Sequence, residues 1–326
     1  MTEAQTLEIR DLSIGVGDHS VVDGVDIAIG QGEIVALVGE SGSGKSLTAL
    51  SIMGLLSGSV RQTGGTAMLE GETLDLANDR AMQKLRGTSL SMIFQEPVAS
   101  LNPLLSVGAQ VAESLIVHGR ATKADAWERA VEMLRDVGIP APEQRARQLP
   151  SELSGGMCQR VMIASALIAE PRLLIADEPT TALDVTIQAQ ILHLMRRLRD
   201  ETDTSVLIIT HDMGVVASVA DRVCVMYGGR IVEQAEVHEL FAAPRHPYTK
   251  LLLATIPRMD GARKTELFSI SGMVPDVSAW PEGCRFRTRC PLASDQCATR
   301  PPLEPVGQGN RHVTACWHFD KVESLI

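Results

Sequence analysis

The chain has 326 residues, enough for two domains, and 44% of them are hydrophobic while only 3% are aromatic. Its net charge of -10 argues against a protein that follows the phosphate backbone of nucleic acid, because such proteins are normally basic or carry a basic stripe. The uncharged stretch at residues 46–60 contains Ser, Thr and Gly and is shorter than the ~18–20 apolar residues that span a bilayer, so we expect a cytoplasmic chain that reaches a membrane only through a partner.

The first part of the chain predicts a small antiparallel sheet that leads into a buried strand. Between residues 7 and 38, short β-branched runs alternate with Gly and Asp turns. Glycines then open a helix of about residues 45–56, and amphipathic spacing predicts further helices from about residue 97 to residue 138.

Two near-continuous apolar runs follow at residues 173–176 and 206–209, with the composition of parallel strands that are buried on both faces. A helix of about residues 185–201 separates them, so the order is strand, helix, strand and the crossover should be right-handed. We expect the regular elements to end near Glu239, because prolines recur after that point and predict a linker and a loop-rich tail.

A glycine-rich loop stands between the first buried strand and its helix. It reads Gly-Glu-Ser-Gly-Ser-Gly-Lys-Ser and matches the P-loop pattern at every fixed position. Its glycines let successive backbone N–H groups turn toward phosphates, and the helix N-terminus adds a partial positive charge. We expect Lys45 to reach the β- and γ-phosphates of ATP and Ser46 to coordinate Mg²⁺. The predicted nucleotide-binding residues of the loop are Gly39, Glu40, Ser41, Gly42, Ser43, Gly44, Lys45 and Ser46.

An acidic pair, Asp177 and Glu178, closes the strand predicted at residues 173–176. Both carboxylates should emerge at the carboxyl edge of the sheet, beside the P-loop. We expect Asp177 to hold the Mg²⁺ shell and Glu178 to polarise the attacking water. Two acids after a strand can also form a helix N-cap, but the neighbouring P-loop favours the catalytic interpretation. These features alone predict a P-loop NTPase of unspecified family.

Four further motifs narrow the family. Residues 153–157, Leu-Ser-Gly-Gly-Met, are similar to the signature motif of ABC (ATP-binding cassette) proteins, and Gln95 resembles their Q-loop. Residues 181–184, Thr-Ala-Leu-Asp, resemble the D-loop, and His211 resembles the switch histidine. Together with the P-loop, these motifs stand in the order and spacing of ABC ATPases over about residues 7–240. The chain is therefore identified as a member of that family by resemblance.

The resemblance implies an α/β fold of the P-loop NTPase class, with an antiparallel β subdomain and an inserted helical subdomain at about residues 97–160. The nucleotide-binding domain would occupy residues 1–240. Residues 241–326 would form a small, loop-rich C-terminal domain. The implied activity is ATP hydrolysis coupled to transport.

The resemblance also implies ATP sites that two chains share. The signature loop of one chain faces the γ-phosphate of the ATP that the opposing chain holds, so two ATP molecules lie between two subunits. The residues implied at the partner's ATP are Ser154, Gly155, Gly156 and Asp184. The implied catalytic residues are Glu178, the Mg²⁺- and water-sensing Gln95, and His211, which bonds to the γ-phosphate. The implied Mg²⁺ ligands are Ser46, Gln95 and Asp177.

A subgroup is indicated by Met157 in the signature motif, by the stretches at residues 159–164, 186–192 and 246–249, and by the tail. These resemble the D-type ATPases of oligopeptide, dipeptide and nickel importers. The resemblance implies a peripheral subunit at the cytoplasmic face of the membrane that powers import of peptides or a similar small solute. Its partners would be a second ATPase (an F-type chain or a copy of itself), two membrane-spanning permease subunits and an extracytoplasmic solute-binding protein, with no nucleic acid.

Two departures from the family pattern stand out. Val16 occupies the region where ABC proteins usually stack an aromatic residue on adenine. The signature motif ends in Met157-Cys158 rather than the commoner Gln, and Cys158 is unusual even in the subgroup that Met157 matches. We interpret Cys158 as a small residue tolerated on the first helical turn. The alternative functions are a soluble ABC ATPase of nucleic-acid repair or translation, and an exporter ATPase. The single cassette without a coiled-coil insertion disfavours the soluble alternative.

The last part of the chain carries four cysteines, Cys284, Cys290, Cys297 and Cys316. Four thiolates in a loop-rich segment suit Zn²⁺ or an iron–sulfur cluster, and a segment with so small a core is hard to fold without a cross-link or metal. The spacing alone does not choose between them, and it also leaves unligated cysteines and a nucleic-acid-binding zinc module open. The subgroup resemblance implies a [4Fe–4S] cluster.

Overall fold

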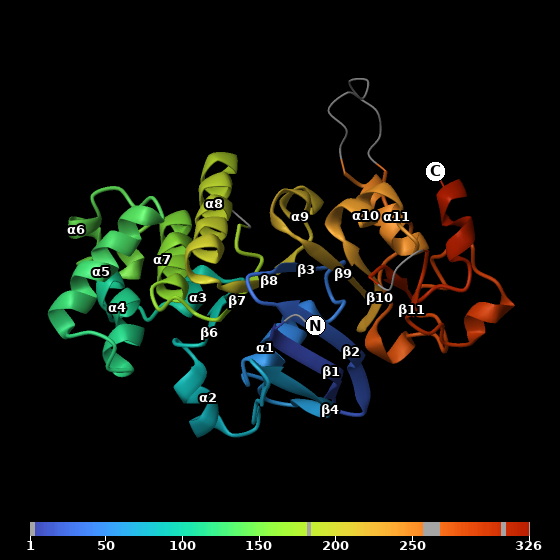
Figure 1. Cartoon of the computed structure of the whole chain (residues 1–326), viewed down its shortest axis with the longest axis horizontal. Coiled ribbons are helices and arrows are strands. Elements are labelled where there is room, and N and C mark those ends of the chain that lie inside the picture. Colours follow the sequence, from blue (N-terminus) through green and yellow to red (C-terminus); the bar gives the residue numbers. More distant parts are fainter. Residues whose placement is uncertain (1–3, 181–183, 257–267, 308–310, 326) are drawn as a thin grey trace.

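The computed structural model describes residues 4–180, 184–256, 268–307 and 311–325. A core sheet crosses the middle of the molecule in the view of Figure 1, with a smaller antiparallel sheet below it. A helical region lies to the left of the core sheet, and the C-terminal tail lies to its right (Figure 1).

The smaller sheet follows the strand order β2-β1-β4-β5. Alternation of apolar and polar residues buries one face of it, as in β1, where Leu7 and Ile9 are buried and Glu8 between them is not. The strands that the sequence predicts here, between residues 7 and 30, are β1 and β2, whereas the two strands at residues 60–69 and 72–73 lie outside the predicted range. The strands of the smaller sheet are β1 (Gln5–Val16), β2 (His19–Gly30), β4 (Val60–Leu69) and β5 (Glu72–Thr73).

The core sheet runs in the order β11-β12-β10-β9-β3-β8-β7-β6, and its members from β9 to β6 are parallel. The predicted strand–helix–strand unit is present as β7, α8 and β8, and β3 lies between β8 and β9. The strands are β3 (Ile34–Val38), β6 (Leu90–Ile93), β7 (Leu173–Asp177), β8 (Ser205–Thr210), β9 (Arg222–Tyr227), β10 (Arg230–Glu236), β11 (Glu304–Pro305) and β12 (Val313–Thr314).

Helices α3 to α7 gather in the helical region at one end of the core sheet (Figure 1). Within the described residues, no helix combines the length and apolar character needed to cross a bilayer. The helices are α1 (Lys45–Ile52), α2 (Asp79–Leu85), α3 (Pro97–Ser100), α4 (Val107–Val117), α5 (Lys123–Asp136), α6 (Pro142–Arg145), α7 (Gly155–Leu167), α8 (Val185–Thr202), α9 (Met213–Val219), α10 (Val237–Ala242) and α11 (Pro247–Ala254).

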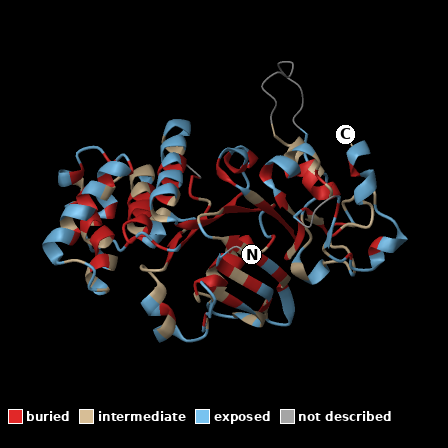
Figure 2. Cartoon of the chain, viewed as in Figure 1, coloured by how far each residue is buried: buried red, intermediate tan, exposed pale blue. Residues whose placement is uncertain are grey.

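The central strands are buried on both faces, which explains their continuous apolar runs (Figure 2). Successive side chains of β3 enter two different cores because a strand alternates its faces. Ile34 and Ala36 pack in the core shared with the helical region. Val35 and Leu37 pack in the core shared with α1 and the antiparallel sheet. The sheet therefore holds the two halves of the molecule together.

The prediction that regular elements end near Glu239 is wrong. Helix α10 continues to Ala242, and α11 covers Pro247–Ala254. The proline that was interpreted as part of a linker stands at the first turn of α11, where a missing N–H costs nothing. His246 caps this helix, because its Nδ1 accepts the backbone N–H of Tyr248 at 3.1 Å.

The tail continues the core sheet, since β12 pairs with β10 and β11 pairs with β12. The buried carboxylate of Glu233 on β10 contacts both the start of α11 and the tail beside β12. It accepts the backbone N–H of His246 at 2.9 Å, and its Oε1 lies 2.7 Å from His312 Nε2. Burial lowers the pKa of His312, but its bonds to Glu233 and Glu239 outweigh burial and raise the pKa overall.

Candidate functional site

The P-loop leaves β3 and ends where α1 begins. Gly39 passes so close to β9 that a Cβ at this position would lie 2.1 Å from the carbonyl oxygen of Met226. Gly44 has a φ of 101°, in the left-handed region, and is the N-cap of α1. Glycine alone meets both demands without strain, so the loop has the backbone path that its sequence pattern requires.

Lys45 points into this loop and is only 6% exposed. Its Nζ donates to the carbonyl oxygens of Gly39 at 2.8 Å and Glu40 at 2.9 Å. Burial lowers the pKa of Lys45, although three neighbouring carboxylates oppose the shift, those of Glu178, Asp177 and Glu40. The ammonium is therefore held at the centre of the loop by bonds that phosphate oxygens can replace.

Asp177 ends β7 beside the P-loop and is 3% exposed. Ser46 donates a hydrogen bond to its carboxylate, whereas no donor among the described residues contacts its buried Oδ1. Burial raises the pKa of Asp177, and the Ser46 bond opposes that shift. A buried carboxylate oxygen without a partner, next to a serine hydroxyl, is an oxygen donor set that fits Mg²⁺.

Glu178 and His211 face each other at the same edge of the sheet. His211 Nδ1 lies 3.1 Å from Glu178 Oε1, and the side chain of Glu178 is 15% exposed against 63% for His211. The backbone of Glu178 has a φ of 49°, a left-handed conformation that a non-glycine residue rarely adopts. Its N–H donates to the carbonyl of Ile209 at 2.8 Å, which holds this conformation in place. Strain of this kind is concentrated at functional sites.

Gln95 is exposed and follows β6, which pairs in parallel with β7. It therefore leaves the sheet at the same carboxyl edge as Asp177.

The signature and D-loop residues stand on other elements and face solvent in the single chain. Ser154 and Gly155 are exposed, and Ser154 caps α7 by accepting the N–H of Met157 at 3.3 Å. Asp184 is exposed and caps α8 by accepting the N–H of Ile187 at 3.0 Å. Gly156 is half-buried on the first turn of α7. The rest of the predicted D-loop, Thr181, Ala182 and Leu183, lies outside the described residues.

The structure adds contacts to this edge that sequence patterns do not reveal. Gln159 on α7 is buried, and its Nε2 donates to the carbonyl of Pro179, one residue after Glu178, at 2.7 Å. The hydroxyl of Tyr248 accepts the N–H of Glu40 at 2.8 Å, across a separation of 208 residues. No periodicity or motif connects residues so far apart in the chain.

The two departures from the family pattern, Val16 and Cys158, both pack against neighbouring residues of the chain. Val16 is half-buried at the end of β1 and packs against the core of the antiparallel sheet. Cys158 is 1% exposed, and its thiol lies 3.5 Å from the carbonyl of Pro150. Burial raises the pKa of Cys158, which keeps the thiol protonated and unreactive.

The four tail cysteines are free thiols that lie within electrostatic reach of one another. Burial, and then the neighbouring cysteines, raise the pKa of Cys290 to about 11 and that of Cys316 to about 12. In the described part of the chain, however, no three His, Cys, Asp or Glu residues are placed to hold a metal ion. The described residues therefore give no support to the predicted metal site, either for one ion such as Zn²⁺ or for an iron–sulfur cluster.

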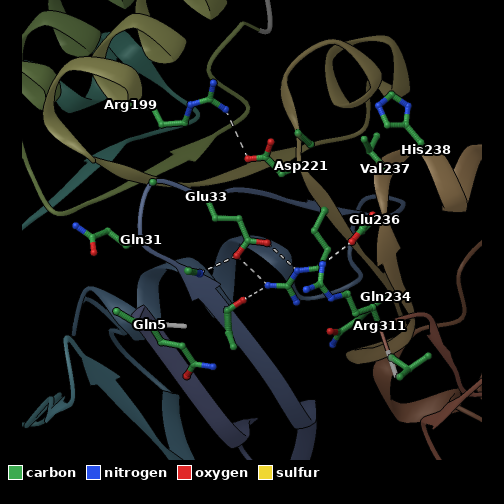
Figure 3. Close-up of a pocket in the computed structure, with 17 residues that line it drawn as sticks. Gln5, Gln31, Glu33, Arg199, Asp221, Gln234, Glu236, Val237, His238 and Arg311 are labelled. Atoms are coloured by element: carbon green, nitrogen blue, oxygen red, sulfur yellow. Dashed lines mark hydrogen bonds and ion pairs between the residues drawn. The ribbon is translucent and has the colours of Figure 1, made fainter. Parts of the chain in front are cut away.

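A cavity of about 1060 Å³ lies at the edge of the core sheet where β3 begins (Figure 3). The P-loop leaves the other end of the same strand. The charged residues of the cavity are paired with one another, including Glu33 with Arg222 at 2.9 Å and Arg311 with Glu236 at 2.9 Å. Arg199 and Asp221 form another pair across it (Figure 3). None of the predicted site residues lines this cavity.

Comparisons with known proteins agree with this geometry. A family model described as ABC transporter matches residues 22–181, and a second, described as oligopeptide/dipeptide transporter, C-terminal region, matches residues 232–297. The chain is 55% identical to the oligopeptide transport ATP-binding protein AppD of Bacillus subtilis, over 86% of each protein. It is 48% identical to the probable peptide ABC transporter ATP-binding protein y4tR of Sinorhizobium fredii, over 98% of this chain and 96% of that protein.

Among solved structures, the chain resembles the dimeric post-hydrolysis state of the ATP-binding cassette MJ0796 bound to ADP and phosphate. The TM-score is 0.65 at 28% identity, and the match covers 71% of this chain and 98% of the cassette. These findings confirm the predicted fold and do not favour the soluble, non-transport alternative. The chain therefore belongs to the ABC transporter family, as an ATP-hydrolysing subunit of the branch that carries the oligopeptide/dipeptide transporter C-terminal region.

Proposed function

We propose that this chain is the ATPase subunit that powers import of peptides, or of a similar small solute, through a membrane permease. The observation that carries the proposal is the meeting of Lys45, Asp177 and Glu178 at one edge of the core sheet, in a chain whose relatives are named for oligopeptide transport. We place the subunit at the cytoplasmic face of the membrane, as a peripheral protein.

ATP binding is assigned to the P-loop, residues 39–46. The backbone N–H groups at the start of α1 and the ammonium of Lys45 hold the β- and γ-phosphates, and phosphate oxygens replace the carbonyls that Lys45 contacts in the free loop. Ser46, Asp177 and Gln95 are the proposed ligands of Mg²⁺. The bound ion supplies charge neutralisation for the β- and γ-phosphate oxygens.

Hydrolysis is assigned to Glu178 and His211. The carboxylate of Glu178 accepts a proton from the attacking water or polarises it, and its fixed backbone aims it at the phosphate side of the sheet edge. The imidazole of His211 orients the carboxylate through the 3.1 Å contact and reaches the γ-phosphate with its other nitrogen. The proposed catalytic residues are Glu178, His211 and Gln95.

A second ATPase subunit completes each site. Ser154, Gly155 and Asp184 are exposed in the single chain, so they are available to a nucleotide held by a facing subunit. Val185, next to Asp184, is 83% exposed, which is unusual for an apolar residue and fits a surface covered on dimerisation. The partner is proposed to be an F-type ATPase or a second copy of this chain.

The permease is proposed to dock beside the Q-loop. A groove of about 280 Å³ next to Gln95 is lined by Phe94, Leu101 and Met162, among others. Three apolar residues near it are exposed. They are Val98, Leu104 and Leu105. A groove lined by both apolar and polar side chains suits one short helix of a permease subunit. The second of the two permease subunits would dock on the second ATPase in the same way, and the permease would receive solute from an extracytoplasmic binding protein.

The tail cysteines are proposed to hold a [4Fe–4S] cluster. Four free cysteines near one another support it, three half-buried and Cys297 buried, and a cluster takes one thiolate at each of four irons, so it tolerates wider spacing than one ion does. Iron and acid-labile sulfide should therefore appear in anaerobically purified protein. Zinc at one per chain without iron would overturn this assignment.

The domain division is likewise a proposal, with residues 1–240 as the nucleotide-binding domain, residues 97–160 as its helical subdomain and residues 241–326 as the C-terminal domain. The gathering of α3 to α7 at one end of the sheet supports the helical subdomain (Figure 1). Mass spectrometry of limited-proteolysis fragments tests the boundaries.

The import function is tested by purifying the tagged chain from membranes of its own host. Permease subunits should co-purify, and ATP turnover in proteoliposomes should rise when a peptide-loaded binding protein is added. Co-purification with ribosomes or DNA, and no permease, would support the non-transport alternative instead.

A further inference from the structure

An ion pair between Arg289 and Glu40 connects the C-terminal tail to the P-loop. The guanidinium of Arg289 donates to both carboxylate oxygens of Glu40, at 2.6 Å to Oε2 and at 3.0 Å to Oε1. The two residues are 249 positions apart, and Glu40 is the second residue of the phosphate-binding loop. Two parallel N–H···O bonds fix direction as well as distance, so the pair holds the Glu40 side chain in one orientation.

Arg289 is itself held by the tail. Its side chain is 5% exposed, its Nε donates to the carbonyl of Ser271 at 3.0 Å, and its Nη2 donates to that of Gly272 at 3.1 Å. Its Nη1 also lies 3.3 Å from the hydroxyl of Tyr227 on β9. Because these contacts fix the guanidinium on its other edges, it presents its free edge to Glu40 in a set position.

The backbone of Glu40 is held from two further directions. Its N–H donates to the buried hydroxyl of Tyr248 on α11 at 2.8 Å, and its carbonyl accepts from Lys45 Nζ at 2.9 Å. Glu40 is thus held by Lys45, Tyr248 and Arg289. The last two follow β10 in the chain and belong to the C-terminal part. Residues of the C-terminal part therefore help to set the path of the P-loop.

The negative charge of Glu40 links the Arg289–Glu40 pair to ATP binding. An unpaired carboxylate in the loop would repel the triphosphate and would compete with it for Lys45. The guanidinium of Arg289 neutralises that carboxylate through bonds to both of its oxygens.

We propose that Arg289 is a positioning residue of the ATP site, which enables full ATP affinity by neutralising Glu40 and fixing the second residue of the P-loop. The inference rests on the proposed assignment of residues 39–46 to the phosphates of ATP. The tail would then contribute directly to ATP affinity through Arg289.

The test is binding of the fluorescent analogue TNP-ATP to the full chain. Arg289→Met should weaken binding about tenfold, since breaking a charge-assisted, part-buried pair leaves a carboxylate facing the phosphates. Adding Glu40→Gln to Arg289→Met should restore affinity to within about threefold of the wild type. Arg287→Met is the matched control, because the Arg287 side chain makes no hydrogen bond or ion pair within the described residues, and it should bind as the wild type does.

Wild-type affinity in Arg289→Met would overturn the inference, and so would failure of Glu40→Gln to restore binding, because a merely unfolded tail cannot be repaired at Glu40. Where the Met variant does not fold, Arg289→Lys is measured, with binding about threefold weaker expected and wild-type affinity contradicting the inference. Lys45→Ala separates the underlying assignment. If Lys45→Ala leaves TNP-ATP binding unchanged, the proposed ATP site itself is wrong. If Lys45→Ala abolishes binding while Arg289→Met binds as the wild type does, only the role of the Arg289–Glu40 pair is contradicted.

Discussion

The Nδ1 atom of His211 lies 3.1 Å from Oε1 of Glu178, and the contact joins the ends of two adjacent parallel strands. Residues 33 positions apart meet because β7 and β8 are neighbours in the sheet, so both side chains emerge at the same edge. The contact orients the carboxylate of the proposed base along this edge of the sheet.

Glu178→Gln should leave ATP binding intact and lower ATP turnover by about 10²–10⁴-fold, because the amide cannot accept the proton of the attacking water. Steady-state phosphate release and TNP-ATP binding measure the two effects separately. Glu201→Gln, an exposed position on α8, is the control. Turnover of Glu178→Gln at the wild-type rate would remove Glu178 from the catalytic role.

Ser154→Arg should reduce turnover of the assembled transporter by at least about 10²-fold, because the bulky cation fills the space meant for the facing subunit's nucleotide. The isolated chain should still bind ATP, since Ser154 is exposed and caps only its own helix. Arg147→Met, a change at an exposed residue of the helical region, should leave turnover near the wild-type value. Unchanged turnover in Ser154→Arg would contradict a shared site.

Asp177→Asn should make the nucleotide-free protein more stable while it weakens the response to Mg²⁺. The carboxylate has a buried oxygen without a partner among the described residues, and replacing a buried, desolvated charge by an amide typically gains about 1 kcal/mol. Thermal unfolding with and without Mg²⁺ and ATP measures both. A variant that Mg²⁺ and ATP stabilise as strongly as the wild type would show that Asp177 is no part of the metal site.

His312 makes the docking of the tail dependent on pH. Because its folded pKa is raised above the ordinary value of about 6.5, its contribution is fully present below that pH and is lost as pH rises through the folded pKa. The melting temperature of the wild type should therefore fall relative to His312→Gln between about pH 6 and pH 9. His193→Gln, at an exposed position on α8, should follow the wild type. Parallel pH curves for wild type and His312→Gln would contradict this linkage.

Phe286→Ala should destabilise the protein by about 3–5 kcal/mol, as for other buried aromatic residues. The ring is 1% exposed and lies 5.0 Å from that of Tyr227 and 5.4 Å from that of Tyr248, measured between centroids. Phe319→Ala is a matched control, because that ring is 40% exposed. Equal chemical-denaturation midpoints for the two variants would mean that the aromatic cluster does not anchor the tail.

Local patterns account for the parts of the fold that the sequence predicts well. The central strands are continuous apolar runs because both faces are buried. The P-loop needs glycine at position 39, where a Cβ would lie 2.1 Å from the carbonyl oxygen of Met226, and at position 44, where φ is positive. The end of the regular elements was placed too early because Pro247 looks the same in a linker as on the first turn of a helix. Only the cap from His246 distinguishes the two, and it depends on the tertiary placement of that side chain.

Contacts between distant segments account for what the sequence could not predict. The pairing of Arg289 with Glu40 and the bond from Gln159 to Pro179 depend on how the tail and the helical region fold back on the core sheet. Neither pair has a spacing that a helix or strand would repeat. The predicted roles of the exposed Ser154 and Asp184 depend on a second subunit, so a single chain leaves them as predictions.

The pairing of β12 with β10 has a consequence for how the protein can be handled. Without the tail strands, β10 would become the outer member of the core sheet, with a row of backbone N–H and C=O groups open to any other extended chain. A fragment trimmed after the cassette is therefore expected to self-associate edge to edge. A shortened protein without the C-terminal region would need charged residues or a proline on β10 to stay monomeric.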